Sequence, residues 1–406
     1  MEVRAGYKQT VVGVIPADWY LDAIANLASI TTGDKNTQDR IEDGAYPFFV
    51  RSQTVEHINS YTFDGEAVLT AGDGVGTGKI FHYINGKFDF HQRVYKISEF
   101  GERLNGYYFY LYFSNHFYSR IMQMTAKSSV DSVRREMIAD MQIPLPSPKE
   151  QRAIAAALSD VDALLTAQDK LIAKKRNIKQ AAMQQLLTGK QRLPGFSGEW
   201  EVKTLGDLFA FSGGYSASRD QLSSEGYCYL HYGDIHGSSK TSIDTEVDYQ
   251  DIPKLDISLK QISAKSLLKD GDIVFVDASE DDEGTSKHVV VVNKSNLPFI
   301  SGLHTIVAKS KTDELSHEYR HYCFQTAAIR QQFLFYAVGT KVSGISKTNI
   351  PKLMLPVPSI PEQNAIAAVL SNIDAELTAL EQQRDKTRSL KQGMMQELLT
   401  GRIRLV

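Results

Sequence analysis

The chain has 406 residues, of which 42% are hydrophobic and 23% are charged, and its formal net charge at pH 7 is −3. This composition is typical of a globular protein with more than one cored domain, and the small negative charge excludes a generally cationic nucleic-acid coat while still allowing local basic faces. The sequence has no apolar run long enough to span a bilayer and no signal-peptide core near its start, so we expect a soluble protein that stays inside the cell. Its two cysteines are far apart, which excludes a cysteine zinc cluster and a disulfide framework.

Two globular segments are predicted, and their elements occur in the same order. In the first, strand-like runs and turns between residues 45 and 98 are followed by an aromatic-rich helix at 106–117. In the second, the strand-like runs GDIVFVDAS and KHVVVVNKSN are followed by a helix at 318–336. Each segment leads into a long helix. The predicted boundaries are a first domain at 1–146, a spacer helix at 147–189, a linker at 190–198, a second domain at 199–358, a second spacer helix at 359–401 and a tail at 402–406.

The long helices are copies of one another. Residues 143–193 and 355–405 align without a gap at a constant offset of 212, and Glu150-Gln151 in the first copy matches Glu362-Gln363 in the second. The pairs Ser147/Glu150 and Ser359/Glu362 predict capping boxes at the helix starts. Gly189 and Gly401 follow as helix-ending glycines.

Both copies contain a heptad pattern at alternating steps of four and three, apolar toward the ends and polar in the middle, which predicts a coiled-coil seam. The seam residues of the first copy are Ile154, Leu158, Val161, Leu165, Ile172 and Leu186. Those of the second copy are Ile366, Leu370, Ile373, Leu377, Leu380 and Leu398. The simplest way to bury both seams is to pair the helices as an antiparallel coiled coil about 60 Å long. The alternative is that each helix separately covers its own domain.

The segments before the helices repeat more faintly, since Gly33 falls opposite Gly214 when the stretches around Trp19 and Trp200 are aligned. The tail TGRIRLV also echoes TGKQRLP, the start of the linker, so the tail and the N-terminus together would rebuild that linker. We therefore predict the α+β fold class: two mixed α/β domains, each followed by a long helix, in a pseudo-twofold internal repeat.

The doubled entry P-x-P-x-x-x-EQ-x-A-I-A-x-x-L, which leads into a long helix that closes on LLTG, resembles the specificity (HsdS) subunits of type I restriction-modification systems. The resemblance covers essentially the whole chain. It implies a non-catalytic, cytoplasmic prokaryotic subunit in phage defence, whose two target-recognition domains each read one half of a bipartite asymmetric sequence in double-stranded DNA. The helical spacer would set the gap between the half-sites.

The resemblance also implies the partners. Two methyltransferase (modification) subunits would dock around the spacer, and restriction (translocase-nuclease) subunits would join for cleavage. S-adenosylmethionine, ATP and magnesium would belong to those subunits, with no cofactor, metal or membrane contact in this chain. The alternative function is a coiled-coil adaptor or scaffold without sequence-specific DNA reading.

Catalytic motifs in the sequence are incomplete. The glycine-rich run at 70–81 fails the phosphate-loop pattern at Asp73 and at Ile80, and it leads into a predicted strand instead of a helix. His317 and His321 form an HExxH pattern that has no evident third metal ligand, so we interpret it as a chance match. We interpret the acidic run at 280–283 as a solvated loop.

Base reading requires polar side chains that loops present to base edges. In the first domain the candidates are Arg51, Ser52, Gln53, Lys79, His91, Gln92, Arg93, Lys127 and Ser128. In the second domain they are Tyr215, Ser218, Arg219, His231, Tyr232, Ser286, Lys287, His288, His304, Lys341 and Lys347. An ordinary surface or structural role remains the alternative for each of them.

Overall fold

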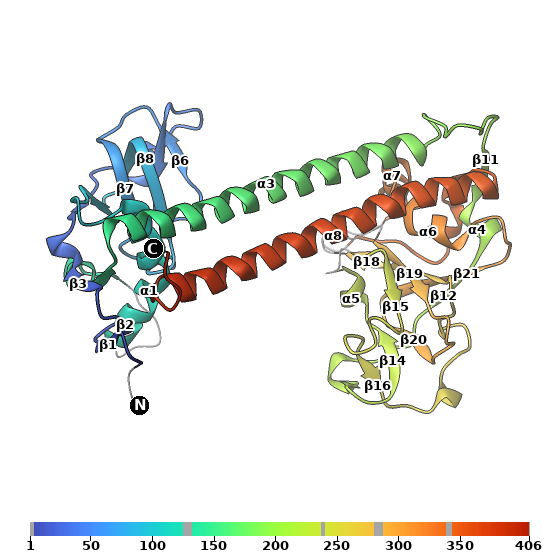
Figure 1. Cartoon of the computed structure of the whole chain (residues 1–406). Helices are drawn as coiled ribbons and strands as arrows, with labels where there is room; N and C mark the ends of the chain where they lie inside the picture. Colours follow the sequence, from blue (N-terminus) through green and yellow to red (C-terminus); the bar gives the residue numbers. More distant parts are fainter. Residues whose placement is uncertain (1–3, 125–131, 237–239, 280–286, 338–342, 406) are drawn as a thin grey trace. The chain divides into compact units, whose positions relative to one another are not determined.

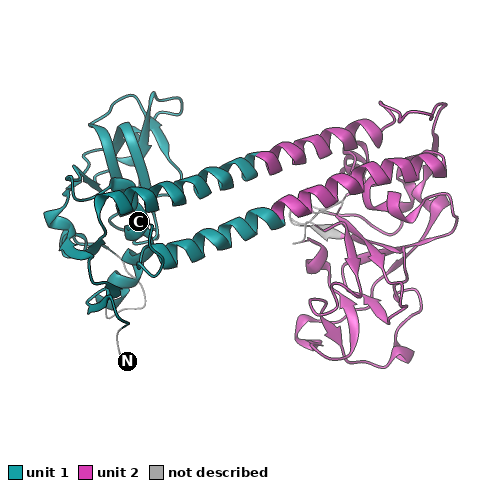
Figure 2. Cartoon of the chain, viewed as in Figure 1, with its two compact units in different colours: residues 1–170, 382–406 teal, residues 171–381 magenta. Residues whose placement is uncertain are grey.

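The computed structural model describes residues 4–124, 132–236, 240–279, 287–337 and 343–405. The chain divides into two compact units (Figure 2): unit 1 contains residues 1–170 and 382–406, and unit 2 contains residues 171–381. The divisions fall inside the two long helices, α3 (Pro148–Leu186) and α8 (Ile360–Leu398), so each unit includes one half of both helices. None of the helices in the described ranges is long and apolar enough to cross a bilayer.

A six-stranded mixed sheet forms the body of unit 1 (Figure 1). Across the sheet the strands are β4 (Ser29–Thr32), β9 (Val94–Ser98), β7 (Phe63–Ala71), β8 (Phe81–Phe90), β5 (Tyr46–Phe49) and β6 (Glu56–Ile58). Helix α1 (Gly106–Met124) packs on this sheet because Phe109, Phe113 and Phe117 repeat every fourth residue and form one buried face. Phe81 contacts two of these rings edge-on, which joins the helix and the sheet in one core.

Smaller elements complete unit 1. They are the hairpin β1 (Tyr7–Thr10) and β2 (Gly13–Pro16), the pair β3 (Tyr20–Ala23) and β10 (Gln142–Leu145), α2 (Arg135–Ala139), and the short helices η1 (Ile24–Asn26) and η2 (Thr37–Asp39).

Unit 2 contains a five-stranded and a four-stranded sheet. The first has the order β12 (Phe209–Gly213), β21 (Thr305–Ser310), β17 (Ile273–Val276), β19 (His288–Val292) and β15 (Ser242–Asp244). The second has the order β13 (Leu222–Ser223), β16 (Lys254–Leu255), β14 (Tyr227–Leu230) and β20 (Phe299–Ser301).

The strand pairing relates the two units. The order β4-β9-β7 of unit 1 recurs as β12-β21-β17, and the parallel pair β5-β8 recurs as β14-β20. The long strand β8 corresponds to two strands of unit 2, β19 and β20, which residues 293–298 separate. One topology is therefore used twice, as the internal repeat predicts.

The remaining elements of unit 2 include a helical segment that differs from the prediction. They are β11 (Glu201–Thr204) with β23 (Met354–Val357), β18 (Ala278–Ser279) with β22 (Ser343–Gly344), α4 (Leu205–Leu208), α5 (Tyr232–His236), α6 (His317–Cys323), α7 (Ala327–Tyr336), η3 (Arg219–Gln221), η4 (Leu259–Gln261) and η6 (Ile350–Lys352). The single helix predicted at 318–336 is wrong. Helix α6 ends at Cys323, and the buried ring of the next residue, Phe324, packs edge-on against Phe275. Helix α7 begins after Thr326, whose hydroxyl accepts a hydrogen bond from the Ile329 N–H.

Within each unit the halves of α3 and α8 pair in opposite directions. In unit 1, Asp162 pairs with Lys391 and Asp169 pairs with Arg384. In unit 2, Arg176 pairs with Glu381 and Lys179 pairs with Asp374. All the predicted seam residues are buried or half-buried, as a buried seam requires. The helix ends also enter the domain cores, with Ile154 and Leu398 in unit 1 and Leu186 and Ile366 in unit 2. The helices therefore pair with each other at some points and cover the domains at others.

The repeated Glu-Gln pair joins each domain to its helix. The amide Nε2 of Gln151 donates to the carbonyls of Arg103 and Pro146, and that of Gln363 donates to those of Glu314 and Pro358. The Gln151 Oε1 accepts from the Asn105 N–H, as that of Gln363 does from the Ser316 N–H. Both glutamines are fully buried and link α3 or α8 to the loop that precedes a domain helix.

The glutamates have a different role from the one predicted. The Glu150 N–H donates to the Ser147 hydroxyl, as in a capping box, but the Glu150 carboxylate accepts from Trp19 Nε1 (3.2 Å) and from Arg404. Glu362 likewise accepts from Trp200 Nε1 (3.0 Å) and Arg192. Each glutamate side chain is only 1% exposed. Its buried carboxylate is stabilised by an indole N–H and a guanidinium, and not by the backbone N–H groups at the helix start.

The equivalence of tail and linker is visible in these contacts. Arg192 follows α3 in unit 2, and Arg404 follows α8 in unit 1 at the matching place. The tail is also held by Tyr7, whose hydroxyl donates to the Gly401 carbonyl, and by Asp18, which pairs with Arg404. The hydrogen bond from Arg404 lowers the pKa of Asp18.

Removing either arginine should destabilise one unit selectively. In Arg404→Ala, the buried Glu150 carboxylate loses its charged partner, and we expect the free energy of unfolding of unit 1 to fall by about 3 kcal/mol. Arg192→Ala should produce the same loss in unit 2. Peptide-resolved hydrogen exchange in urea would measure both. Arg402→Ala is the control, because its pair with Glu397 is solvent-exposed and should contribute less than about 0.5 kcal/mol. If Arg404→Ala increased hydrogen exchange equally in both units, Arg404 would not stabilise unit 1 selectively.

Candidate nucleic-acid interface

Three loops of unit 1 meet at one place. They follow β5, follow β7 and precede β9, and the segment before α2 lies against them. The His91 N–H donates to the Phe49 carbonyl, the Gly72 N–H to the Arg93 carbonyl, and the Val133 N–H to the Gly72 carbonyl. These bonds fix the backbone of residues whose side chains the sequence nominates for DNA contact.

The side chains at this place form a charged cluster. Arg51 Nη1 lies 2.7 Å from one carboxylate oxygen of Asp73, and Arg93 Nη1 lies 3.5 Å from the other. Gln92 donates from its side-chain amide to Asn36 beside them. We call Arg51, Asp73, Gln92 and Arg93 the unit 1 cluster; it carries more positive than negative charge.

The same backbone arrangement occurs in unit 2. The Gly302 N–H donates to the Leu230 carbonyl, the Asp277 N–H to the His304 carbonyl, and the Ile345 N–H to the Asp277 carbonyl. These bonds place His304 where unit 1 has Arg93, and Tyr232 where it has Arg51.

The side chains of this second place differ from those of the first. The His304 ring contacts Tyr232 edge-on at 5.5 Å and lies 3.3 Å from the Asp277 carboxylate, and Tyr232 also contacts His231. The guanidinium of Arg219 lies close against Gly233. We call Arg219, His231, Tyr232, Asp277 and His304 the unit 2 cluster. His304 has a φ of 58°, a left-handed conformation that is uncommon for a residue with a side chain.

Two glycines allow these loops to approach the strand ends. A Cβ on Gly33 would overlap the Phe90 carbonyl, and a Cβ on Gly214 would overlap the Gly302 carbonyl. The alignment of Gly33 with Gly214 in the sequence therefore reflects a shared close approach of two backbones.

His91 and His231 stabilise the turns from inside. The His91 Nδ1 accepts from the Arg93 N–H at 2.9 Å, and the His231 Nδ1 accepts from the Gly233 N–H at 3.0 Å. Burial lowers the pKa of both rings, which agrees with neutral imidazoles that accept at Nδ1. Both nominated histidines therefore stabilise the conformation of the loops on which the neighbouring candidate residues lie.

A cavity of about 550 Å³ lies beside the unit 1 cluster. Arg93, Arg134 and Arg135 line it, together with Asp73 and Glu136. The sequence analysis missed Arg134 and Arg135. Their adjacency at the start of a short helix was the available signal, and it is a common pattern on solvated surfaces.

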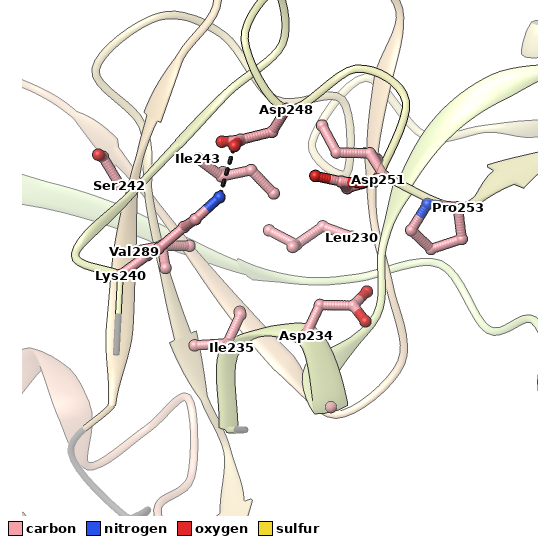
Figure 3. A pocket seen from close by; sticks show the side chains of 12 residues that line it. Leu230, Asp234, Ile235, Lys240, Ser242, Ile243, Asp248, Asp251, Pro253 and Val289 are labelled. Atoms are coloured by element: carbon pink, nitrogen blue, oxygen red, sulfur yellow. Dashed lines mark hydrogen bonds and ion pairs between the residues drawn. The ribbon is translucent and has the colours of Figure 1, made fainter. Parts of the chain in front are cut away.

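A second hollow of about 390 Å³ lies in unit 2 beside the end of β14 (Figure 3). Its floor is apolar, with Leu230, Ile235 and Val289, whereas Asp234 and Asp251 lie on its rim, where Lys240 pairs with Asp248. Burial raises the pKa of Asp234. The carboxylates of this rim disfavour phosphate, so the hollow is a poor place for the DNA backbone.

The other nominated residues lie apart from the two clusters or have local roles. Ser52 donates to the Thr54 carbonyl, Gln53 is exposed, and Lys79 lies over the Tyr118 ring. The Tyr215 carbonyl accepts from Tyr229, Ser218 caps η3, and Lys287 donates to the His236 carbonyl. His288 is buried against Phe275 and Phe324, and Lys347 lies against Gly213. Lys127, Ser128, Ser286, Lys341 and the acidic run at 280–283 fall outside the described residues.

The HExxH pattern lies on α6 with its histidines in different surroundings. His317 lies 3.7 Å from Asp270, whereas burial lowers the pKa of His321, which lines a wide groove of unit 2. Among the described residues, His, Cys, Asp and Glu form no group of three that could hold a metal ion.

A duplicated scaffold whose copies present different polar side chains at matching strand ends defines a two-domain recognition protein. The family described as "Type I restriction modification DNA specificity domain" matches residues 16–175 and 197–387. These matches cover more than half of the chain, which therefore belongs to the family of type I restriction-modification specificity subunits.

Individual relatives agree with this membership. The chain is 34% identical to the Escherichia coli type I restriction enzyme EcoDI specificity subunit over 146 residues, which are 36% of this chain and 32% of that protein. It is 23% identical to the Methanocaldococcus jannaschii MjaVIII specificity subunit over 96% of this chain and 94% of that one. The crystal structure of the type I S subunit from M. genitalium has the same fold, with a TM-score of 0.59, 14% identity and 98% of both chains covered.

The close approach at Gly33 and Gly214 can be tested directly. Gly33→Ala should destabilise unit 1, and Gly214→Ala unit 2, by about 2 to 3 kcal/mol, because the new methyl group overlaps a backbone carbonyl. Thermal unfolding and peptide-resolved hydrogen exchange would measure the loss. Gly101→Ala is the control, since a Cβ there meets nothing within 4 Å. If Gly33→Ala behaved like Gly101→Ala, the backbone contact would not constrain the loop.

Proposed function

We propose that the two domains each read one half of a bipartite, asymmetric sequence in double-stranded DNA. The family membership supports a DNA specificity role over the alternative of an adaptor without sequence reading. The observation that carries the proposal is the pair of clusters. Matching backbone positions hold Arg51 and Arg93 in unit 1 but Tyr232 and His304 in unit 2. Different side chains on one scaffold suit two different half-sites.

The long helices would set the gap between the half-sites and dock two methyltransferase subunits. Helical spacers suit this role because a helix fixes distance at 1.5 Å per residue, whereas a flexible linker does not. Ion pairs along both halves of the helix pair support a defined register. Restriction (translocase-nuclease) subunits would join the same assembly.

Catalysis would lie in the partner subunits. Specificity subunits are non-catalytic parts of type I restriction-modification complexes, and S-adenosylmethionine, ATP and magnesium would bind the methyltransferase and restriction subunits. This chain would contribute the choice of DNA sequence.

Modified-base sequencing tests the proposal. The chain would be co-expressed with its neighbouring methyltransferase in a methylation-free host, and the methyltransferase alone would be the control. We expect adenine methylation in a split, asymmetric motif only when this chain is present. A stable complex of the two proteins that yields no new methylation would contradict sequence reading and favour the adaptor alternative.

A further inference from the structure

We propose that Arg51 and Arg93, oriented by Asp73, read guanine in the half-site of the first domain. This inference rests on the proposed function and adds to it the residues and the base that determine one half of the specificity.

The first observation is that one carboxylate orients two exposed guanidinium groups. Asp73 is 23% exposed in its side chain, whereas Arg51 and Arg93 are 43% and 64% exposed. Its position is fixed because a β-bridge joins Asp73 to Ser132 and the preceding Gly72 is bonded at both its N–H and its carbonyl. The two arginines therefore extend toward solvent from a fixed anchor.

The second observation concerns the donors that this arrangement leaves. Each guanidinium approaches Asp73 through Nη1, and among the described residues no hydrogen-bond partner is found for the Nε or Nη2 of Arg51 or Arg93. Two adjacent N–H donors match the N7 and O6 acceptors that guanine presents in the major groove. Adenine offers an acceptor and a donor at the same edge, so it fits this fork less well.

The third observation separates base reading from phosphate binding. The Asp73 carboxylate between the two guanidinium groups would repel a phosphate but tolerates the neutral edge of a base. Arg134 and Arg135 line the adjacent cavity and lie at the start of α2. We assign the phosphate contacts to these two arginines, which would position the duplex for Arg51 and Arg93.

Unit 2 differs at the matching positions, which hold Tyr232 and His304; the His304 ring contacts Tyr232 and lies 3.3 Å from Asp277. Neither side chain has the forked donors of a guanidinium. The requirement for guanine at these positions is therefore a property of the first half-site.

The test uses the full chain with its methyltransferase and reads the methylated motif by modified-base sequencing. The wild-type motif should contain at least one G·C pair in the half-site that belongs to the first domain. In Arg51→Ala and in Arg93→Ala, discrimination for guanine at one position of that half-site should fall about tenfold to hundredfold, with the other half-site unchanged.

Two further variants distinguish base reading from charge alone. Arg51→Lys retains the positive charge but loses the fork, so it should relax the same position while the salt dependence of binding stays as in the wild type. Asp73→Asn should lower guanine discrimination and strengthen binding to unrelated DNA, because it releases the arginines and removes a negative charge. A variant that only loses folding would lose methylation at all sites, without a selective change in guanine discrimination or in binding to unrelated DNA.

Arg134→Ala is the matched control. It should reduce methylation at all sites equally and weaken the salt dependence, with every base of the motif retained. The inference is overturned if Arg51→Lys and Arg93→Ala retain the wild-type motif in full, or if the first half-site contains no G·C pair. A wild-type chain that directs no split motif at all would instead contradict the proposed function.

Discussion

Glu150 and Glu362 are the buried charges that organise each unit. Each lies in the first turn of a long helix and accepts hydrogen bonds from a domain tryptophan and from an arginine that follows the end of the other helix. A carboxylate with 1% of its surface exposed is costly to bury alone, by several kcal/mol, so both donors contribute to the stability of the folded unit. The start of one helix, the end of the other and the domain body are thereby held together.

This anchoring frees the opposite part of each domain to vary. The strand ends are fixed by backbone hydrogen bonds, by glycines without a Cβ and by buried neutral histidines, none of which determines the exposed side chains. Unit 1 could therefore acquire an arginine pair and unit 2 an aromatic and imidazole group on one topology. In physical terms, the residues that stabilise the scaffold differ from those that we propose to read DNA.

The sequence was sufficient for the repeat, the helix seams and the fold class, because those features depend on periodicity and on an ungapped match. The seam residues from Ile154 to Leu398 are buried or half-buried as predicted. The role of Glu150 was not predictable, since its partners Trp19 and Arg404 are distant in sequence and a local capping box explained the same pattern. The break at Phe324 was missed for a similar reason, because a tertiary contact of the ring overrides helical propensity.

The candidate site was predictable only in part. Arg51, Arg93, His231, Tyr232 and His304 were nominated as loop residues and lie beside strand ends, but periodicity carries no information about which loops meet. Asp73 entered the sequence analysis only as the residue that spoils a phosphate loop, and its contact with two arginines became visible only in three dimensions. Whether any of these side chains contacts DNA stays a prediction.

Independence of the two readers is the central claim, and exchange of one domain tests it most directly. Residues 200–355 would be replaced by the corresponding domain of a related specificity subunit that has a tryptophan at the position of Trp200, so that the contacts of Glu362 are kept. Modified-base sequencing should show that one half of the methylated motif changes while the other half stays as in the parent chain. A change in both halves would contradict two separate readers on a shared scaffold.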